Sequence, residues 1–151
     1  MILSMKDTIQ FDEKLIQEDY LDNPWAMLVC CILLNQTNNK QVRPVLNSVF
    51  TYIPDARRAS DCDPQILAGL IKSTGFQNVK STRIIKLSKK WIDGFETVDE
   101  LPGIGKYGRE SWDIFVDRNF DINPTDKKLS LFLHSGGPDR ITSCHSALTN
   151  S

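Results

Sequence analysis

Apolar residues recur along most of this chain with the spacing of amphipathic helices. In the segment 78–93, Ile84, Leu87 and Trp91 fall on one face, as expected for a helix that packs on a core. The segment 25–34 is apolar on nearly all sides, which predicts a central buried helix. The same reasoning predicts further helices over 11–21, 40–52, 106–117 and 126–133, with shorter ones after Asp63–Pro64 and over 97–101.

Helix boundaries and the lack of strand signals indicate the fold class. Asn23–Pro24 is a typical helix start, and Gly75 and Gly94 are placed as helix stops. No stretch alternates apolar and polar residues for long enough to predict a strand. We therefore expect an all-α protein with one compact helical domain. Its predicted bounds are a flexible N-terminus over 1–10, the domain over 11–134 and an irregular C-terminal tail over 135–151.

Composition mainly excludes other classes of protein. Apolar residues make up 40% and charged residues 25% of the chain, as in ordinary globular domains. The longest apolar run, 25–34, is far too short to span a bilayer, and the first residues lack a signal-peptide pattern. We expect an intracellular monomer that makes no membrane contact.

The four cysteines do not form a metal-binding pattern. Cys30 and Cys31 lie inside the apolar run, whereas Cys62 and Cys144 stand alone, so the chain has no C-x-x-C pair. Burial as small apolar side chains explains the first two. We expect no iron–sulfur cluster, no other metal cluster, no disulfide framework and no cofactor.

Charge is unevenly distributed along the chain. The net charge is −1 and the isoelectric point is about 6.1, which does not by itself indicate a nucleic-acid partner. However, the segment 72–90 carries six basic residues and no acidic one, whereas acidic residues dominate 7–22. The six are Lys72, Lys80, Arg83, Lys86, Lys89 and Lys90. This segment is either a surface that attracts phosphate or a solvated helix face.

The segment Leu101-Pro-Gly-Ile-Gly-Lys-Tyr-Gly108 carries the clearest chemical signal. Gly103 and Gly105 flank Ile104, a pattern typical of a tight turn between helices whose backbone N–H groups point outward. Such groups at a helix start bind a phosphate, directly or through a bridging cation. The hairpin is therefore also a candidate site for a monovalent cation. Ile104 can anchor the turn in the core. A purely structural connection between two helices is the alternative.

Further motifs extend this signal beyond the hairpin. They are Gln17-Glu18, Asn23-Pro24-Trp25, Leu34-Asn35-Gln36-Thr37, Lys72 with Gly75-Phe76, and Pro124-Thr125-Asp126-Lys127-Lys128-Leu129. With these motifs, the chain resembles the helix-hairpin-helix DNA glycosylases of the endonuclease III-like superfamily over about 15–133. Within that superfamily it most resembles the glycosylase domain of the methyl-CpG-binding mismatch thymine/uracil glycosylases. The resemblance implies a base-excision repair enzyme that acts on double-stranded DNA, in the cytoplasm, nucleoid or nucleus.

Asp126 is the predicted catalytic residue. A carboxylate beside the anomeric carbon can stabilise the positive charge that develops when a glycosidic bond breaks. The superfamily places such an Asp about twenty residues after the hairpin, and Asp126 follows Gly105 by 21 residues. Taken alone, Asp126 could instead be an ordinary helix cap.

The residue after the hairpin turn bears on the type of glycosylase. Superfamily members with lyase activity have a lysine there, which forms a Schiff base with the sugar. The matching position holds Tyr107, whose phenol cannot do so, and Lys106 precedes it. We therefore expect a monofunctional enzyme in which Tyr107 contacts the flipped base, with a bifunctional enzyme using Lys106 as the alternative. Without the resemblance, Tyr107 could be a packing aromatic residue.

Base flipping requires residues that fill the gap in the duplex. By resemblance, Gln36 matches the position of a residue inserted into the base stack, and Phe76 matches a second wedge. Gln17 matches a glutamine that reads the base. Taken alone, Gln17 and Gln36 could be solvated amides and Phe76 could fold into the core. The thymine glycosylases have Arg where Gln36 stands, so the preferred opposite base does not follow from the resemblance.

The remaining predicted DNA contacts come from the hairpin and the helix after it. They are Gly103, Ile104, Gly105, Lys106, Gly108 and Lys128. Uracil or thymine opposite guanine is the expected target, although the two differ by a single methyl group. A noncatalytic DNA-binding module that keeps the hairpin is the alternative from another functional class. His134 and His145 have no evident partners, and we assign them no role.

Overall fold

The computed structural model describes residues 14–142, and within them every regular element is a helix, which confirms the expected all-α fold. The elements in chain order are η1 (Ile16–Tyr20), α2 (Pro24–Leu34), α3 (Asn39–Tyr52), α4 (Ala56–Ser60), α5 (Pro64–Leu70), η2 (Lys72–Thr74), α6 (Gln77–Asp93), η3 (Val98–Glu100), α7 (Lys106–Phe115) and α8 (Lys127–His134). A further helical segment covers 137–142.

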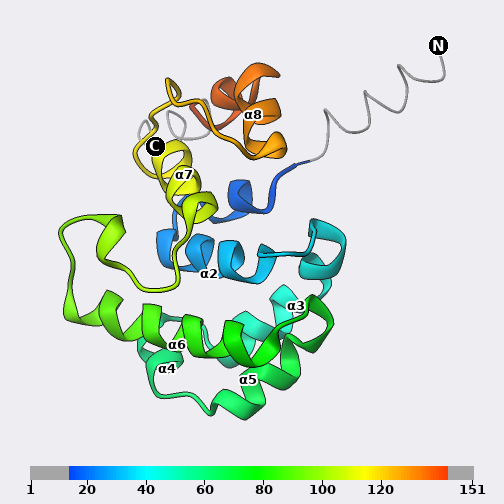
Figure 1. Ribbon diagram of the computed structural model, residues 1–151, viewed down its shortest axis with the longest axis vertical. Coiled ribbons are helices and arrows are strands. Elements are labelled where there is room, and N and C mark those ends of the chain that lie inside the picture. The colour runs from blue at the N-terminus through cyan, green and yellow to red at the C-terminus, as the bar shows by residue number, and fades with distance from the viewer. Residues whose placement is uncertain (1–13, 143–151) are drawn as a thin grey trace, which may run out of the picture.

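Helix α2 is the central element of the fold. It begins where Asn23 caps the backbone N–H of Ala26 and Pro24 occupies the first turn. All residues from 25 to 33 are buried, because η1, α3, α6 and α7 pack around this helix. Figure 1 shows α2 between a group formed by α3 to α6 and a second group that contains α7 and α8.

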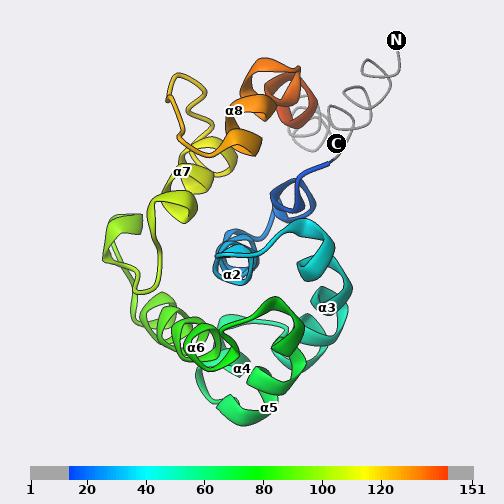
Figure 2. The ribbon, with the colours of Figure 1, turned by 45° about the vertical axis from the view of Figure 1, so that its right-hand side comes forward.

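The two groups of helices have separate hydrophobic cores. The larger core joins α2 to the helices α3–α6. The smaller one consists of Leu15, Ile114, Phe115, Leu129, Phe132 and Ile141. Tyr107 packs against both cores, so its side chain lies where the two groups of helices meet. Figure 2 shows the two groups on opposite sides of α2.

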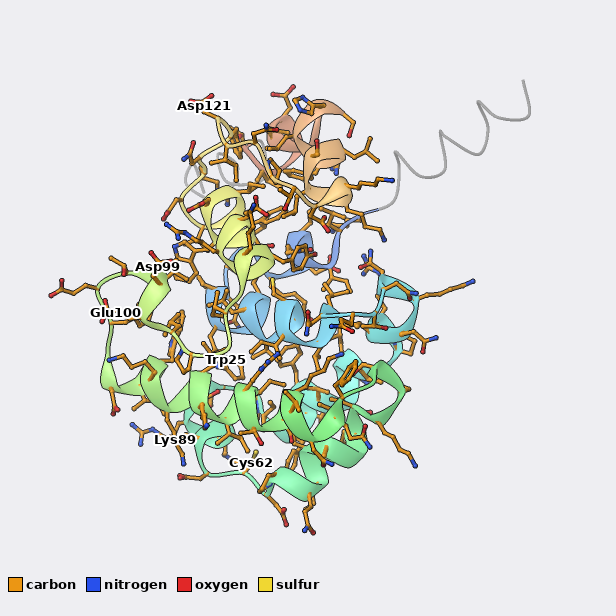
Figure 3. The ribbon with its side chains drawn as sticks, in the orientation of Figure 1. Trp25, Cys62, Lys89, Asp99, Glu100 and Asp121 are labelled. Atoms are coloured by element: carbon orange, nitrogen blue, oxygen red, sulfur yellow. The ribbon has the colours of Figure 1, made fainter. Side chains whose placement is uncertain are left out.

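Polar and aromatic contacts join α6 to the neighbouring helices. The indole Nε1 of Trp25 donates to Ser88 Oγ at 2.9 Å, and Figure 3 shows Trp25 between α2 and α6. At the end of α6, the rings of Trp91, Phe95 and Trp112 lie 5.0 to 6.1 Å apart and connect α6 to α7. These contacts fix the chain on both sides of the segment that carries the hairpin.

The sequence did not predict helix α4. It has only five residues, too few to show a helical period, although Asp55 caps it by accepting from Arg58 N at 2.8 Å.

The helix predicted over 11–21 was wrong in its described part, where only the 3-10 helix η1 forms. Successive residues there face different partners: Gln17 bonds to α7, whereas Glu18 bonds to Arg140.

The C-terminal tail is more regular than predicted. An irregular chain was expected from residue 135, but 137–142 is helical, with Pro138 in its first turn. Ile141 is buried in the smaller core, and Arg140 pairs with the buried Glu18 carboxylate at 3.0 Å. These contacts bring the segment onto the domain. The predictions for 1–10, for Phe11, and for Cys144 and His145 lie outside the described residues.

Candidate active site

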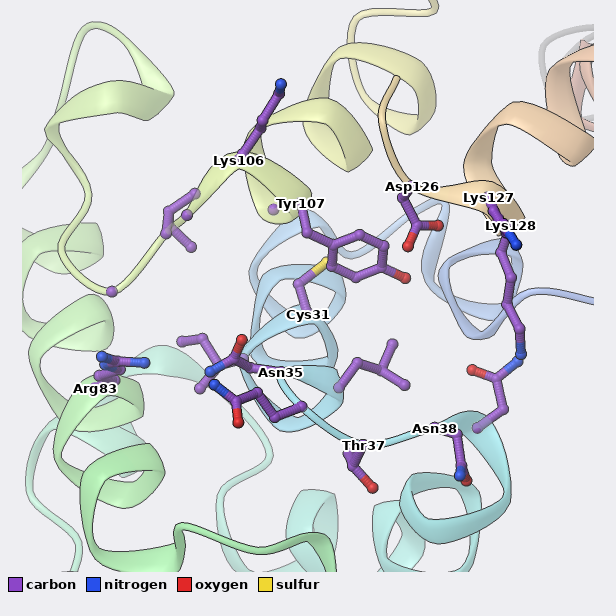
Figure 4. A pocket seen from close by; sticks show the side chains of 18 residues that line it. Cys31, Asn35, Thr37, Asn38, Arg83, Lys106, Tyr107, Asp126, Lys127 and Lys128 are labelled. Atoms are coloured by element: carbon purple, nitrogen blue, oxygen red, sulfur yellow. The ribbon is translucent and has the colours of Figure 1, made fainter. Parts of the chain in front are cut away.

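A pocket of about 460 Å³ lies between the two groups of helices. Its walls are the turn after α2, the hairpin before α7, the start of α8 and one residue of α6 (Figure 4). The side chains that give it chemical character are Cys31, Asn35, Gln36, Thr37, Asn38, Arg83, Lys106, Tyr107, Asp126, Lys127 and Lys128. The pocket therefore gathers residues from four separate stretches of the chain.

The hairpin forms the tight turn that its two glycines predict. Gly103 has a φ of 80°, which a residue with a side chain rarely adopts, and Gly105 is the N-cap of α7. Ile104 packs against the larger core and anchors the turn. No side chain caps α7, so the first N–H groups of this helix remain available to an anion.

Gly108 is buried and serves packing. A Cβ atom at this position would lie 3.0 Å from Ile104 Cγ2 and 3.8 Å from Cys31 Cβ. The absence of a side chain therefore leaves room for Ile104, whereas 3.8 Å to Cys31 is an ordinary contact distance. Gly108 also lines the pocket, and its predicted contact with DNA stays a prediction.

Asp126 is the N-cap of α8 and also lines the pocket. Its Oδ2 accepts from the backbone N–H of Leu129 at 3.0 Å, which fixes the carboxylate, whereas Oδ1 makes no hydrogen bond to any described residue. Figure 4 shows the carboxylate directed into the pocket beside the ring of Tyr107. The same side chain thus caps α8 through one carboxylate oxygen and lines the pocket.

Tyr107 and Gln17 form a hydrogen-bonded pair at the edge of the pocket. Gln17 Nε2 donates to Tyr107 Oη at 2.6 Å and to Ser111 Oγ at 3.1 Å. Burial raises the pKa of Tyr107 well above its usual value, and Cys31 and Asp126 raise it further. Tyr107 is therefore a neutral phenol at any physiological pH, with a proton to donate.

Gln17 itself is buried and does not line the pocket. It lies behind Tyr107, so direct reading of a base by Gln17 stays a prediction.

The thiol of Cys31 also lines the pocket but is not a nucleophile. Burial raises its pKa to about 12, with a smaller contribution from Asp126 in the same direction and an opposing one from Ser111. A protonated thiol of this kind is inert at neutral pH. Cys31 therefore contributes shape and apolar surface.

The pocket is locally cationic although the whole chain has a net charge of −1. Arg83, Lys106, Lys127 and Lys128 are exposed at its edge, and Asp126 is the one carboxylate among the described lining residues. Between residues 14 and 142, Arg83, Lys106 and Lys127 form no ion pair, whereas Arg109 outside this pocket pairs with Asp99 at 3.1 Å. In Figure 4, Lys106 extends away from Tyr107 and Asp126.

The two predicted wedge residues occupy turns with left-handed backbone. Gln36 (φ 56°) is exposed and lines the pocket. Phe76 (φ 49°) precedes α6, is 57% exposed and does not line the pocket. The alternative that Phe76 folds into the core is thus wrong.

The sequence did not identify Arg83 as a site residue. The aliphatic part of its side chain lies against Gly103, because a Cβ atom there would be 3.0 Å from Arg83 Cβ. Asn35, Thr37, Asn38 and Lys127 were also not identified. The basic segment 72–90 was a partial signal for Arg83, but only packing brings α6 to the hairpin.

Lys80, from the same basic segment, does not belong to a surface that attracts phosphate. It is fully buried, with its Nζ bonded to backbone and hydroxyl oxygens.

Neither a metal-binding cluster nor a membrane-spanning helix occurs in the part of the chain that the structure describes. Between residues 14 and 142, no group of three or more His, Cys, Asp or Glu side chains could hold a metal ion. Over the same residues, no helix is long and apolar enough to cross a membrane.

Comparisons with known proteins give a consistent result. A family model described as HhH-GPD superfamily base excision DNA repair protein matches residues 29–135. The chain is 34% identical over 120 residues to a methyl-CpG-binding domain protein 4-like protein of Arabidopsis thaliana, covering 78% of this chain and 27% of that protein. It is 28% identical over 106 residues to a thymine/uracil-DNA glycosylase of Pyrobaculum aerophilum (65% and 46%). It is 27% identical over 93 residues to a thymine-DNA glycosylase of Aeropyrum pernix (56% and 42%). The chain spans less than half of the length of these relatives.

Proposed function

The chain belongs to the HhH-GPD superfamily of base excision DNA repair proteins, and we propose that it is a monofunctional DNA N-glycosylase for uracil or thymine opposite guanine. In this proposal, it acts inside the cell as a monomer on double-stranded DNA and hydrolyses the bond between the flipped pyrimidine and its sugar. The names of two relatives, thymine/uracil-DNA glycosylase and thymine-DNA glycosylase, support the substrate class.

The observation that carries the proposal is the position of Asp126. Its carboxylate faces a pocket whose edge is cationic, and one of its oxygens makes no hydrogen bond within the described part of the chain. As the bond between C1′ and the base nitrogen breaks, the sugar gains positive charge, which a carboxylate beside it stabilises. The base leaves with the bonding electron pair, water then bonds to C1′, and the proton that this water loses passes to the pyrimidine anion.

The charges and N–H groups around the pocket suit a DNA strand. The uncapped start of α7 offers donors to one phosphate, and Arg83, Lys127 and Lys128 can contact neighbouring phosphates. The turn at 102–105 could also hold a monovalent cation between its carbonyl oxygens and a phosphate. Gln36 and Phe76 would then fill the space left by the flipped nucleotide.

Tyr107 supports recognition of a pyrimidine carbonyl. Because Gln17 donates to its oxygen, the phenol can give its own proton to an acceptor in the pocket. A pyrimidine presents carbonyl oxygens as such acceptors. In this proposal, Gln17 acts on the base through Tyr107.

Base release from defined duplexes tests the proposal. Duplexes with U or T opposite G are incubated with the protein and then treated with alkali, which cleaves the strand at abasic sites. We expect strand cleavage only after alkali, and no covalent adduct with abasic DNA under borohydride. Release of no base from any lesion would favour a noncatalytic DNA-binding protein, and a trapped adduct would favour a lyase that uses Lys106.

The Asp126→Asn variant tests the carboxylate separately from the cap. Asn caps helices as well as Asp, so we expect the free energy of unfolding to change by less than about 0.5 kcal/mol. Base release should fall by about 100-fold or more because the stabilising charge is lost. Binding to undamaged duplex, measured by fluorescence anisotropy, should persist. Wild-type activity in this variant would remove Asp126 from the mechanism.

A further inference from the structure

Lys80 is a fully buried lysine that does not line the pocket described above. It lies near the start of α6, and its Nζ donates to Leu33 O at 2.7 Å, to Thr74 O at 2.8 Å and to Thr74 Oγ1 at 3.4 Å. An ammonium group has three N–H donors, so these three oxygens satisfy all of them.

The oxygens that hold Lys80 belong to the ends of two helices. Leu33 is in the last turn of α2, where carbonyl groups have no partner within the helix and a cation is favourable. Thr74 is the last residue of η2. These three acceptors carry no formal charge, and burial lowers the pKa of Lys80.

Each of these helix ends leads directly into a turn with a proposed wedge residue. Leu33 precedes Gln36 by three residues, and Thr74 precedes Phe76 by two. Both wedge residues have positive φ angles, which non-glycine residues keep only where the surroundings hold them. The bonds of Lys80 are therefore in the right place to hold both turns.

We propose that Lys80 is a positioning residue that sets the spacing between Gln36 and Phe76. One ammonium group joins the two turns, so the two side chains enter the duplex together at a fixed separation. This inference rests on the proposed function, because the spacing matters only if a base is flipped. If Lys80 merely stabilised the core, replacing it would affect these two turns no more than the rest of the fold.

Ser88 provides a matched control. It is a buried polar residue on α6, and its Oγ accepts from Trp25 Nε1 near the opposite end of α2. The Ser88→Ala variant therefore removes a buried bond between the same two helices without touching either turn.

Amide hydrogen exchange without DNA tests the structural part. The backbone N–H groups of Asn35, Thr37, Thr74 and Gly75 are hydrogen-bonded at 2.9 to 3.2 Å, so their protection can be measured. We expect these four N–H groups to exchange about tenfold faster in Lys80→Met than in Ser88→Ala. The two variants are compared under conditions that give them the same free energy of unfolding. Equal protection in the two variants would overturn the proposal.

Single-turnover base release tests the functional part. We expect Lys80→Met to release the base ~10- to 100-fold more slowly than wild type, since small displacements of positioning groups have effects of this size. Its affinity for undamaged duplex should stay within about twofold, because phosphate contacts are unchanged. The fluorescence of 2-aminopurine beside the target base should show less flipping. A slowing no larger than that of Ser88→Ala would contradict the proposal.

Double mutants separate positioning from general destabilisation. If Lys80 acts through the turns, Gln36→Ala and Phe76→Ala should have smaller effects in the Lys80→Met background than in wild type. Additive effects would overturn the proposal. If Lys80→Met does not fold, Lys80→Gln replaces it in the same comparisons. The Gln amide keeps two N–H donors on the side chain at position 80.

The two proposals fail in different ways. If the wild-type protein releases no base, the proposed function is wrong. The exchange comparison between Lys80→Met and Ser88→Ala still decides whether Lys80 holds the two turns.

Discussion

Asp126 and Tyr107 come from different helices, and each is held by a group that lies outside the pocket. The N–H of Leu129 fixes one carboxylate oxygen, and the amide of Gln17 fixes the phenol. Groups that are held in place before the reaction need little reorganisation when charge develops. The site therefore depends on a helix cap and a buried hydrogen bond as much as on the side chains that face the pocket.

Ionisation of Tyr107 should destabilise the fold at alkaline pH. The pKa of the folded state is raised above the ordinary value of 10.0, mainly by burial. The stability that the neutral phenol contributes is therefore fully present below pH 10 and is lost as pH rises toward the higher pKa. The free energy of unfolding should fall in that range by up to about 1.4 kcal/mol per pH unit for this group.

Urea unfolding of wild type and Tyr107→Phe, from about pH 9 to about pH 11, measures this effect. The variant lacks the titrating group, so its stability should depend less on pH. Parallel stability curves for the two proteins would show that Tyr107 does not titrate as expected.

Among the elements, the hairpin combines a tight turn at Gly103 with the uncapped start of α7. Ile104 fixes it to the larger core, and the aromatic rings of Trp91, Phe95 and Trp112 brace the segments around it. These contacts hold the turn in place, and no side chain caps the first N–H groups of α7. Rigid donors bind a phosphate with a smaller entropic loss than a mobile loop does.

The two glycines of the hairpin should respond differently to alanine. Gly103→Ala places a side chain at a φ of 80° and 3.0 Å from Arg83 Cβ, so we expect a loss of about 1–3 kcal/mol in the free energy of unfolding. Gly105 has an ordinary φ of −89° and nothing within 4 Å of the added Cβ. Gly105→Ala should cost less, about 0.5–1 kcal/mol, because Ala is a poorer N-cap than Gly. Equal losses in urea unfolding would contradict the assigned turn geometry.

For the whole molecule, the two groups of helices lie on opposite sides of α2, and the pocket lies between them. The cationic side chains at the edge of the pocket lie on α6, the hairpin and α8. A chain with a net charge of −1 therefore has a basic surface around this pocket. Such a local field attracts DNA without a basic overall composition.

Salt dependence of DNA binding should locate this surface. Arg83 and Lys89 are both exposed on α6, but Arg83 lines the pocket, whereas Lys89 points away from α2 (Figure 3). We expect Arg83→Ala to lower the slope of log K against log salt by about one unit, because one phosphate contact is lost. Lys89→Ala should leave the slope unchanged. The same slope in both variants would exclude Arg83 from the interface.

Most of the helices, the hairpin and the placement of Asp126 at a helix start could be predicted from the sequence. These features are local, because a helical period, a cap or a glycine turn is written in a few consecutive residues. The irregular tail was a wrong prediction for 137–142, since that helix depends on contacts with Glu18 and the smaller core.

Which side chains meet could not be predicted and depends on the packing of the helices. This packing buried Lys80, although the sequence pattern placed it among surface lysines, and it put Gln17 behind Tyr107. It also brought Arg83 beside Gly103, which is 20 residues away in the chain. Such contacts depend on which faces of helices far apart in the chain pack together. They cannot be predicted from a single sequence.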